Sequence, residues 1–153
     1  GIQSYEIDPV VDFLTDGLYE VTLVTLNEFG CPDTLRMDYN LMFKGLWVPN
    51  AFSPNNPNGA VTRFKPVGIN LEQYTMEVFD TWGNLLWTSS ELDEKGSPAE
   101  GWDGSFNGSL LQQDVYMWKA SAVFKDGTIW QGLDVGNTTN IHPKTYGTVT
   151  LVR

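Results

Sequence analysis

The sequence predicts an all-β protein whose larger part is an antiparallel β-sandwich of about seven strands, with a closed barrel as the alternative. Apolar and polar residues alternate with a period of two in several runs, whereas the period of amphipathic helices is almost absent. Between these runs, 15 Gly and 8 Pro residues mark frequent turns. Aromatic residues make up 13% of the chain and include six Trp, which suits packing between β layers.

The first segment, residues 1–44, predicts two or three strands. In GLYEVTLVTLNEFGC, one face carries Tyr19, Val21 and Leu23, and NEFG supplies a hairpin turn. DTLRMDYNLMF then reads as the returning strand. Because two or three strands cannot close a sandwich, we expect this segment to be the tail of a preceding β domain.

The stretch VPNAFSPNNPNG, residues 48–59, is unusually rich in Pro and Asn. Pro49 and Pro54 fix their own φ angles and favour extended geometry in the residues before them. Phe52 is expected to insert into the sandwich. We interpret the stretch as a stiff connecting strand, and direct contact with a partner is the alternative.

The strands of the sandwich follow. QYTMEVFD places Tyr74, Met76 and Val78 on one face, TWGN predicts a tight turn, and LLWTS returns. GWDGSFNG holds three Gly in eight residues, which predicts turns with positive φ.

The most regular alternation is in VYMWKASAVF, residues 115–124, where one face carries Tyr116, Trp118, Ala120, Ala122 and Phe124. KDG predicts a hairpin turn, and TIWQG predicts a strand that pairs back. YGTVTLVR is the last strand, and a terminal strand that pairs with an edge is expected to be integral to the core.

Charge and hydropathy exclude several partner classes. Nine basic against nineteen acidic residues give a net charge of −10 and a pI of about 4.3. Binding to nucleic acid or to an anionic membrane surface requires Lys and Arg, so neither is expected. No run approaches the roughly 20 apolar residues of a membrane span. No signal peptide opens the chain, and the first residue falls in mid-pattern, so we expect a fragment of a longer protein.

The sequence offers little to an enzyme or a metal site. Cys31 is the single cysteine and His142 the single histidine, so no disulfide within the chain and no metal cluster are expected. Cys31 is expected to be buried as a small apolar residue. Asp80 and Asp103 are the plausible carboxylate pair of a glycosidase, but both stand in turns where capping backbone N–H groups explains them. We therefore expect no catalysis and no cofactor.

Five motifs, in this order, carry a resemblance to a known family: VPNAFSPN, YTMEVFDTWGNLLW, GWDGSFNG, VYMWKA and GTVTLVR. Residues 45–153 resemble the gliding motility-associated C-terminal domain of Bacteroidetes, which is the type B sorting domain of the type IX secretion system. Residues 1–44 are similar to the end of a PKD-type Ig-like repeat. For residues 45–153, an Ig-like sandwich is expected. The residues that carry the central motifs are Trp82, Gly83, Gly101, Trp102, Asp103, Gly104 and Tyr116.

The resemblance implies a C-terminal secretion signal that directs a large surface protein, an adhesin with a possible role in gliding, through the periplasm to the cell surface or out of the cell. It implies recognition by the type IX machinery, through a small outer-membrane β-barrel protein dedicated to type B domains. Pairing with an edge strand is one physical route to such recognition. The candidate positions are Val48, Pro49, Asn50, Ala51, Phe52, Ser53, Pro54, Tyr146, Gly147, Thr148, Val149, Thr150, Leu151, Val152 and Arg153.

The chain departs from the family pattern in several places. NNPNGAV lacks the acidic residues of the usual loop, so calcium binding there is not expected, and Asn55, Asn56 and Asn58 are expected to make turn bonds. Thr81 stands where the family usually has Arg. QQD replaces a Pro-x-Gly turn, in which Asp114 could take a left-handed conformation. Residues 133–145 resemble an insertion.

A carbohydrate-binding or adhesive module is the alternative function, because six Trp could form a stacking platform for sugars. Against it, Trp82, Trp102 and Trp118 are expected to pack against the sheet. Trp47, Trp87 and Trp130 are left open by the sequence.

Overall fold

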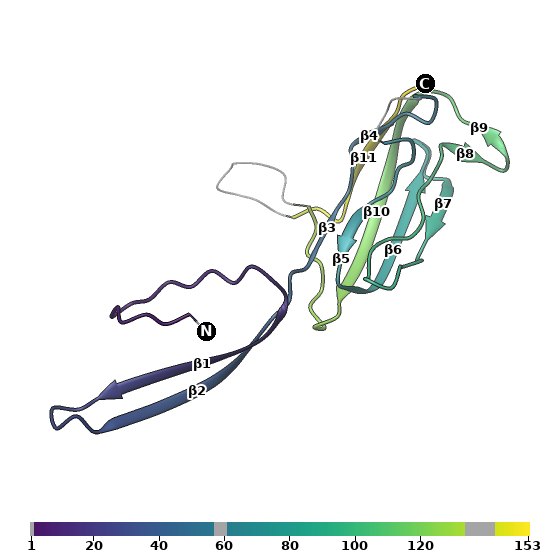
Figure 1. The fold of residues 1–153 in the computed structure, drawn as a ribbon. Coiled ribbons are helices and arrows are strands. Elements are labelled where there is room, and N and C mark those ends of the chain that lie inside the picture. Colours follow the sequence, from purple (N-terminus) through teal and green to yellow (C-terminus); the bar gives the residue numbers. More distant parts are fainter. Residues whose placement is uncertain (1, 57–60, 134–142) are drawn as a thin grey trace. The chain divides into compact units, whose positions relative to one another are not determined.

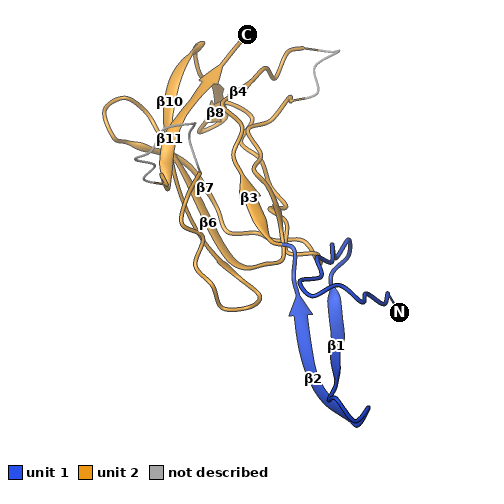
Figure 2. Ribbon diagram, turned by 90° about the vertical axis from the view of Figure 1, so that its left-hand side faces the viewer, with its two compact units in different colours: residues 1–43 blue, residues 44–153 orange. Residues whose placement is uncertain are grey.

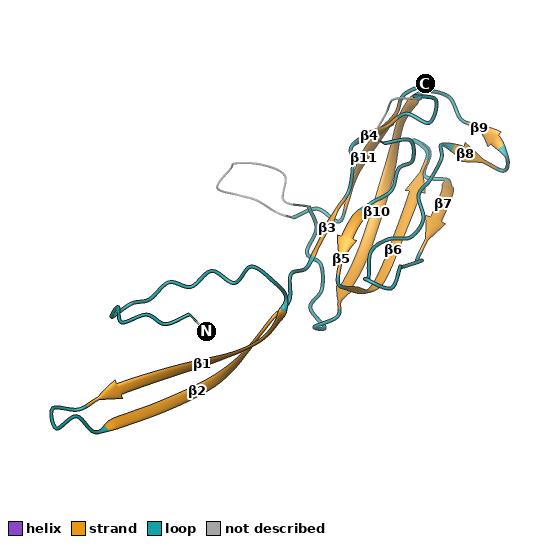
Figure 3. Ribbon diagram, in the orientation of Figure 1, coloured by secondary structure: helices purple, strands orange, loops and turns teal. Residues whose placement is uncertain are grey.

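The structure of the chain is a computed structural model that describes residues 2–56, 61–133 and 143–153 (Figure 1). The chain divides into two compact units, Gly1–Phe43 and Lys44–Arg153 (Figure 2), and each is described by itself. The described residues form strands, turns and loops, as Figure 3 shows, which confirms the all-β prediction. No helix long and apolar enough to cross a membrane occurs among them.

The first unit is built on an antiparallel hairpin of β1 (Gly17–Leu26) and β2 (Pro32–Leu41), in which Leu23 lies opposite Leu35. The Asn27 side chain closes the turn, because its Oδ1 accepts hydrogen bonds from the N–H groups of Phe29 and Cys31 at 3.0 and 2.9 Å. The hairpin is thus confirmed.

Cys31 is exposed in this turn, so the expectation of a buried cysteine is wrong. Its backbone N–H helps to close the turn through Asn27, and that position faces water instead of a core. Beyond the turn, Phe13 lies against the rings of Tyr19 and Tyr39, with centroid distances of 4.4 and 5.8 Å. These rings are the main aromatic cluster in the described part of this unit.

The second unit contains a five-stranded sheet in the order β4-β11-β10-β6-β7. Its strands are β4 (Ala51–Phe52), β11 (Tyr146–Leu151), β10 (Asp114–Phe124), β6 (Leu71–Phe79) and β7 (Leu85–Ser89). Neighbouring strands are antiparallel except β11 and β4, which are parallel. Figure 1 shows β10 in the middle of this sheet, between β11 and β6.

A second, shorter layer covers one face of the sheet. β3 (Gly45–Trp47) pairs with β5 (Val67–Ile69), and Phe64 exchanges backbone hydrogen bonds of 2.8 and 3.0 Å with Trp102. The small hairpin of β8 (Ser105–Phe106) and β9 (Ser109–Leu110) follows. The second unit is therefore a sandwich of one full sheet against short strands and ordered loops.

The core lies between these layers and confirms the predicted faces of the two central strands. Burial alternates along β10, whose predicted face is buried from Tyr116 to Phe124, and along β6 from Tyr74 to Val78. The buried apolar residues are Leu46, Val48, Phe52, Phe64, Leu71, Tyr74, Met76, Val78, Trp102, Tyr116, Trp118, Ala120, Ala122, Phe124, Trp130, Val149 and Leu151.

The segment predicted to pair back, residues 128–132, does so over residues 128–130 only. The KDG turn is present, Phe124 N–H donates to Thr128 O and Trp130 N–H donates to Ala122 O, both at 2.9 Å, and Ile129 bridges Val123. Beyond Trp130, Leu133 pairs instead with Lys144, each backbone N–H donating to the other's carbonyl. The intervening residues 134–142 of the expected insertion, with His142, lie outside the described residues.

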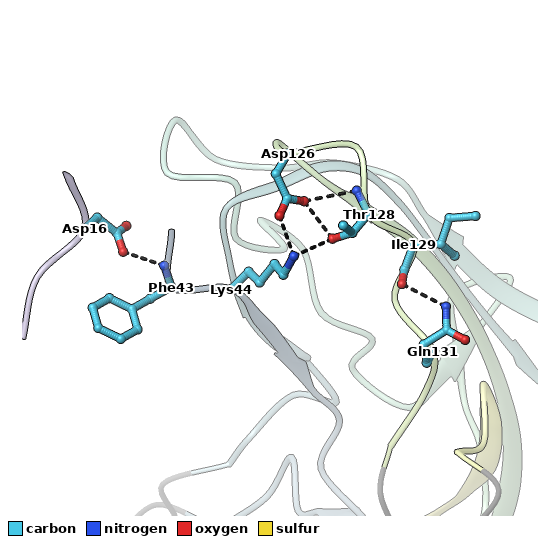
Figure 4. A network of polar contacts seen from close by, with 7 residues as sticks. All are labelled: Asp16, Phe43, Lys44, Asp126, Thr128, Ile129 and Gln131. Carbon is cyan, nitrogen blue, oxygen red and sulfur yellow. Dashed lines mark hydrogen bonds and ion pairs between the residues drawn. The ribbon is translucent and has the colours of Figure 1, made fainter. Parts of the chain in front are cut away.

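A polar cluster holds the start of the second unit to the tip of the β10 turn (Figure 4). The Lys44 ammonium forms an ion pair with Asp126 and donates to Thr128 Oγ1 at 2.6 Å. It also lies over the Phe124 ring, 5.6 Å from the centroid. The Lys44 hydrogen bond is the main reason that the pKa of Asp126 falls to about 2. In the first unit, Asp16 accepts a hydrogen bond from the Phe43 N–H.

Candidate functional site

Residues 48–54 are held in the sandwich by three buried side chains. Val48, Pro49 and Phe52 are buried, and the Phe52 ring lies 5.5 Å from that of Trp102. Phe52 therefore inserts into the core as expected. The backbone of the stretch pairs with β11, because the carbonyls of Asn50 and Phe52 accept hydrogen bonds from it at 2.8 and 2.9 Å.

The last strand, β11, lies inside the sheet order and has one partly open edge. It pairs with β10 along its whole length, but with β4 only at Thr150 and Leu151. The N–H of Thr150 points toward β4. Since alternate residues of a strand direct their N–H groups to the same side, Tyr146 and Thr148 direct theirs to that side too. No strand of the described chain pairs with that side of Tyr146–Val149.

The face of β11 that is turned toward the other layer of the sandwich is fixed in the core. Val149 and Leu151 are completely buried. A Cβ on Gly147 would lie 2.8 Å from the Trp118 ring, and the Trp118 indole donates to Thr148 O at 3.2 Å. A cleft of about 480 Å³ lies beside the open edge, lined by Phe79, Met117, Trp118, Lys119, Lys144, Tyr146, Gly147 and Thr148.

The turn that joins β6 to β7 is closed by one carboxylate. Asp80 Oδ1 accepts from the N–H groups of Trp82 and Asn84 at 2.9 and 2.8 Å, and Oδ2 accepts from the Asn84 side-chain amide at 2.8 Å. These bonds, the Asn84 amide first, hold the pKa of Asp80 below its usual value. Gly83 takes the left-handed conformation with φ of 84°. The expected tight turn is present.

Trp82 projects from this turn into solvent. Its side chain is 88% exposed, so the expectation that it packs against the sheet is wrong. The turn is stabilised by hydrogen bonds to Asp80, which leaves the indole with no structural task in the described chain. Trp102 and Trp118 are buried as expected, and Trp130 is buried as well, whereas Trp47 is 57% exposed.

The GWDG motif has a structural role. Trp102 is 1% exposed, its indole donates to Ser105 O at 2.8 Å, and its ring packs edge-on against Tyr116. Asp103 Oδ1 accepts from the Ser105 hydroxyl and N–H, and the hydroxyl bond is the first cause of the lowered pKa of Asp103. Asp80 and Asp103 thus both cap turns, as the sequence suggested.

The two glycines of the GWDG motif are required for different physical reasons. Gly104 has φ of 77°, as expected, and a Cβ there would meet Leu151 at 3.0 Å. Gly101 is not left-handed, so the prediction of positive φ is wrong for it. A Cβ at Gly101 would lie 2.7 Å from that of Lys65, so close packing explains this glycine. Asp114 is not left-handed either; Asn70 and Asn107 are, with φ of 58° and 50°.

A second cleft, of about 590 Å³, opens beside the Asp80–Asn84 turn. Its lining residues are Asp80, Thr81, Trp82, Asn84, Leu86, Phe106, Leu111, Gln112, Asp114, Val115 and Tyr116. They come from the β6–β7 turn, from β7, from the β8–β9 hairpin, from the connection that follows it and from the start of β10. Among the residues that the structure describes, no group of three or more His, Cys, Asp or Glu could hold a metal ion.

Residues 46–132, more than half of the chain, match the CHU_C type IX secretion signal domain. The chain belongs to this family. Membership in the CHU_C family means that the sandwich carries a type IX secretion signal, which implies export to the cell surface or secretion and contact with the secretion machinery. The matched range begins in β3 and contains both turn motifs described above.

Two solved structures are similar to this CHU_C chain at a low level. One is dimeric latent PorU from Porphyromonas gingivalis, with 12% identity, a TM-score of 0.38, and coverage of 91% of this chain and 12% of that one. The other is a tetra-tandem repeat from the extending region of a large adhesion protein, with 17% identity, a TM-score of 0.36, and coverage of 91% and 32%. Both TM-scores are below 0.5, so neither contributes to the argument. No curated protein matches the sequence.

Proposed function

We propose that residues 45–153 direct a large surface adhesin of the gliding type through the type IX system by binding a small outer-membrane β-barrel protein. The observation that carries this proposal is the match of residues 46–132 to the type IX secretion signal domain. Residues 1–44 would be the end of a PKD-type repeat of that adhesin. Their exposed hairpin supports this view, because its apolar side chains are of the kind that a larger domain would cover.

We further propose that the domain works by binding alone and catalyses no reaction. The two carboxylates that could serve a glycosidase are engaged elsewhere, since Asp80 and Asp103 each accept hydrogen bonds that close their own turns. Their pKa values are lowered, so neither is suited to act as a general acid at neutral pH.

The open edge of β11 is the surface that we propose for pairing with the partner. The N–H groups of Tyr146 and Thr148 face outward there, whereas the 48–54 stretch uses its backbone to bind β11. A partner strand could add to this edge with main-chain hydrogen bonds. The 48–54 stretch occupies the rest of the same edge, at Thr150 and Leu151.

The test grafts residues 45–153 onto an unrelated passenger and measures its appearance outside a bacterium with a type IX system. Thr148→Pro removes an outward N–H and should block export, because a strand cannot pair across it. Thr88→Pro on β7 is the matched control, since Thr88 also directs its N–H to an open edge of the sheet.

Both variants are first compared by thermal unfolding, and equal Tm values are required to interpret the secretion result. If the wild-type graft remains inside the cell, the proposed function is wrong. If the wild type and Thr148→Pro are exported equally, the function stands and pairing at β11 is wrong. Deletion of residues 146–153 is uninformative here, because it removes the buried Val149 and Leu151.

A further inference from the structure

The end of the sandwich around Trp82 presents apolar side chains that the core does not use. Trp82 is 88% exposed, Val115 43% and Phe106 38%, and all three line the cleft beside the β6–β7 turn. We call these three residues, together with Asp80 and Asp114, the Trp82 surface. Trp is the residue type most enriched among the few side chains that dominate binding energies at protein interfaces.

Both turns of the Trp82 surface are pre-organised. Asp80 fixes the turn below Trp82 with three hydrogen bonds. The β8–β9 hairpin turns at Asn107 and Gly108, whose φ values of 50° and 76° are those of a tight two-residue turn. A surface that is already ordered loses little conformational entropy on binding, which favours recognition.

The charge of the surface is negative. Asp80 and Asp114 line the cleft beside Trp82, and its described lining includes no Lys, Arg or His. Arg153, a cation whose charge acts on Tyr116, has its guanidinium tethered to the carbonyls of Leu111 and Gly104 at 2.8 and 3.1 Å. The chain as a whole carries −10. Charge complementarity therefore requires a basic partner segment.

We propose that the Trp82 surface docks a protein segment that carries Arg or Lys beside apolar residues, with the cation over the Trp82 ring and close to Asp80 or Asp114. A cation over an indole face is favourable in its own right. The inference rests on the proposed function, since it places that segment on the outer-membrane partner. It assigns a second contact, separate from the edge of β11.

A sugar is the competing ligand class, and the hydrogen bonds of Asp80 and Asn84 disfavour it at the Trp82 turn. Sugars need side chains with unused donors and acceptors beside the aromatic ring. Here the Asn84 amide donates to Asp80 Oδ2, and Asp80 Oδ1 already accepts twice. The carboxylate keeps its charge for a cation but offers little to a hydroxyl group.

The test uses the full chain, residues 1–153, and two synthetic peptides of 12 residues, one alternating Arg with Leu and the other alternating Glu with Leu. Binding is followed by calorimetry and by the NMR shift of the Trp82 indole N–H. We expect the Arg peptide to bind, the Glu peptide not to bind, and Trp82→Ala to weaken binding at least ~10-fold. The matched control Trp47→Ala should leave the affinity unchanged.

Charge is tested by Asp114→Lys against Glu94→Lys, which makes the same change on an exposed loop elsewhere. Asp114→Lys should abolish binding of the Arg peptide, and Glu94→Lys should not. In the secretion assay, Trp82→Ala should lower export at least several-fold while its Tm stays at the wild-type value.

Three results would each overturn the inference: unchanged export and peptide binding in Trp82→Ala, preference for the Glu peptide, or binding of laminarin or xylan oligosaccharides that Trp82→Ala abolishes. These results are distinct from a failure of the wild-type graft to be exported, which would instead overturn the proposed function.

Discussion

The β1–β2 hairpin and the β6–β10 pair are both long antiparallel pairs with alternating apolar residues, yet only one of them is buried. In the hairpin, Val21, Leu23 and Met37 are 47–59% exposed, whereas Met76 and Val78 of β6 are completely buried. The difference lies in the layer above the strands. β6 and β10 are covered by β3, β5 and the bridged residues Phe64 and Trp102, and the described first unit has no such cover.

The comparison separates what forms a strand from what stabilises it. Alternation and a good turn are enough to define a hairpin, but a two-stranded hairpin by itself is marginal in water. Burial of each large side chain contributes about 1.5–3 kcal/mol, and the hairpin forgoes most of that contribution. Stability should therefore be concentrated in the second unit.

Hydrogen exchange should show the largest contrast between the two regions. We expect amides of Trp118 and Ala120 in β10 to exchange ~10³-fold more slowly than those of Val21 and Leu23, because the former open only with the core. Exchange of the 1–153 chain followed by mass spectrometry or NMR measures this. Equal protection of both pairs would show that the hairpin has a cover of its own.

The second-largest contrast should be between the alanine variants of Trp102 and Trp82, in their free energies of unfolding. Trp102→Ala removes a buried ring that packs on Phe52 and Tyr116 and should lower the free energy of unfolding by about 3–5 kcal/mol. Trp82→Ala, at an exposed turn, should change it by less than about 0.5 kcal/mol. Urea unfolding followed by circular dichroism gives both values, and a large loss in Trp82→Ala would contradict the exposed position.

Two left-handed glycines test close packing separately from backbone strain. At Gly96, with φ of 72°, a Cβ would overlap the Leu71 carbonyl, whereas at Gly83, with φ of 84°, it would meet open space. Left-handed strain costs both alanine variants about 1–2 kcal/mol, and overpacking adds about 1–3 kcal/mol to Gly96→Ala alone. Similar Tm values for the two variants would contradict the packing at Gly96.

The smallest expected effect is on the acid dependence of Tm, and it is tested with one ion pair from each unit. Lys44 lowers the pKa of Asp126 from its usual 3.8 to about 2, so the folded state favours the carboxylate. The stability that this pair adds is present above about pH 4 and is lost as the pH falls toward 2. Asp126→Asn should flatten the fall in Tm over that range.

The control for this pair is Glu20→Gln in the hairpin. Glu20 and Arg36 lie 3.7 Å apart with more than half of each side chain exposed, and such pairs contribute little. Glu20→Gln should therefore leave the acid profile unchanged. An identical profile for Asp126→Asn and the wild type would show that the Lys44 cluster is not formed in solution.

The sequence predicts what depends on periodicity and fails where tertiary contacts decide. The buried face of β10 and the hairpin of the first unit follow from alternation and turn residues. The predicted strand after Gly127 pairs with β10 over residues 128–130 only, and Leu133 pairs instead with Lys144, a contact that local sequence does not signal.

The candidate site shows the same limit. Trp82 reads as a packing residue in the sequence, but the hydrogen bonds of Asp80 already close its turn, so its ring is free to face solvent. The parallel pairing of β4 with β11, which leaves part of the β11 edge open, also has no local signal in the sequence.

That parallel pairing has a mechanical consequence. A pull between the chain upstream of Lys44 and residue 153 would act along β4 and β11 in opposite senses. The hydrogen bonds from Thr150 to Asn50 and from Val152 to Phe52 would then be sheared together instead of unzipping one after the other. A domain joined in this way is suited to remain folded under tension along the chain.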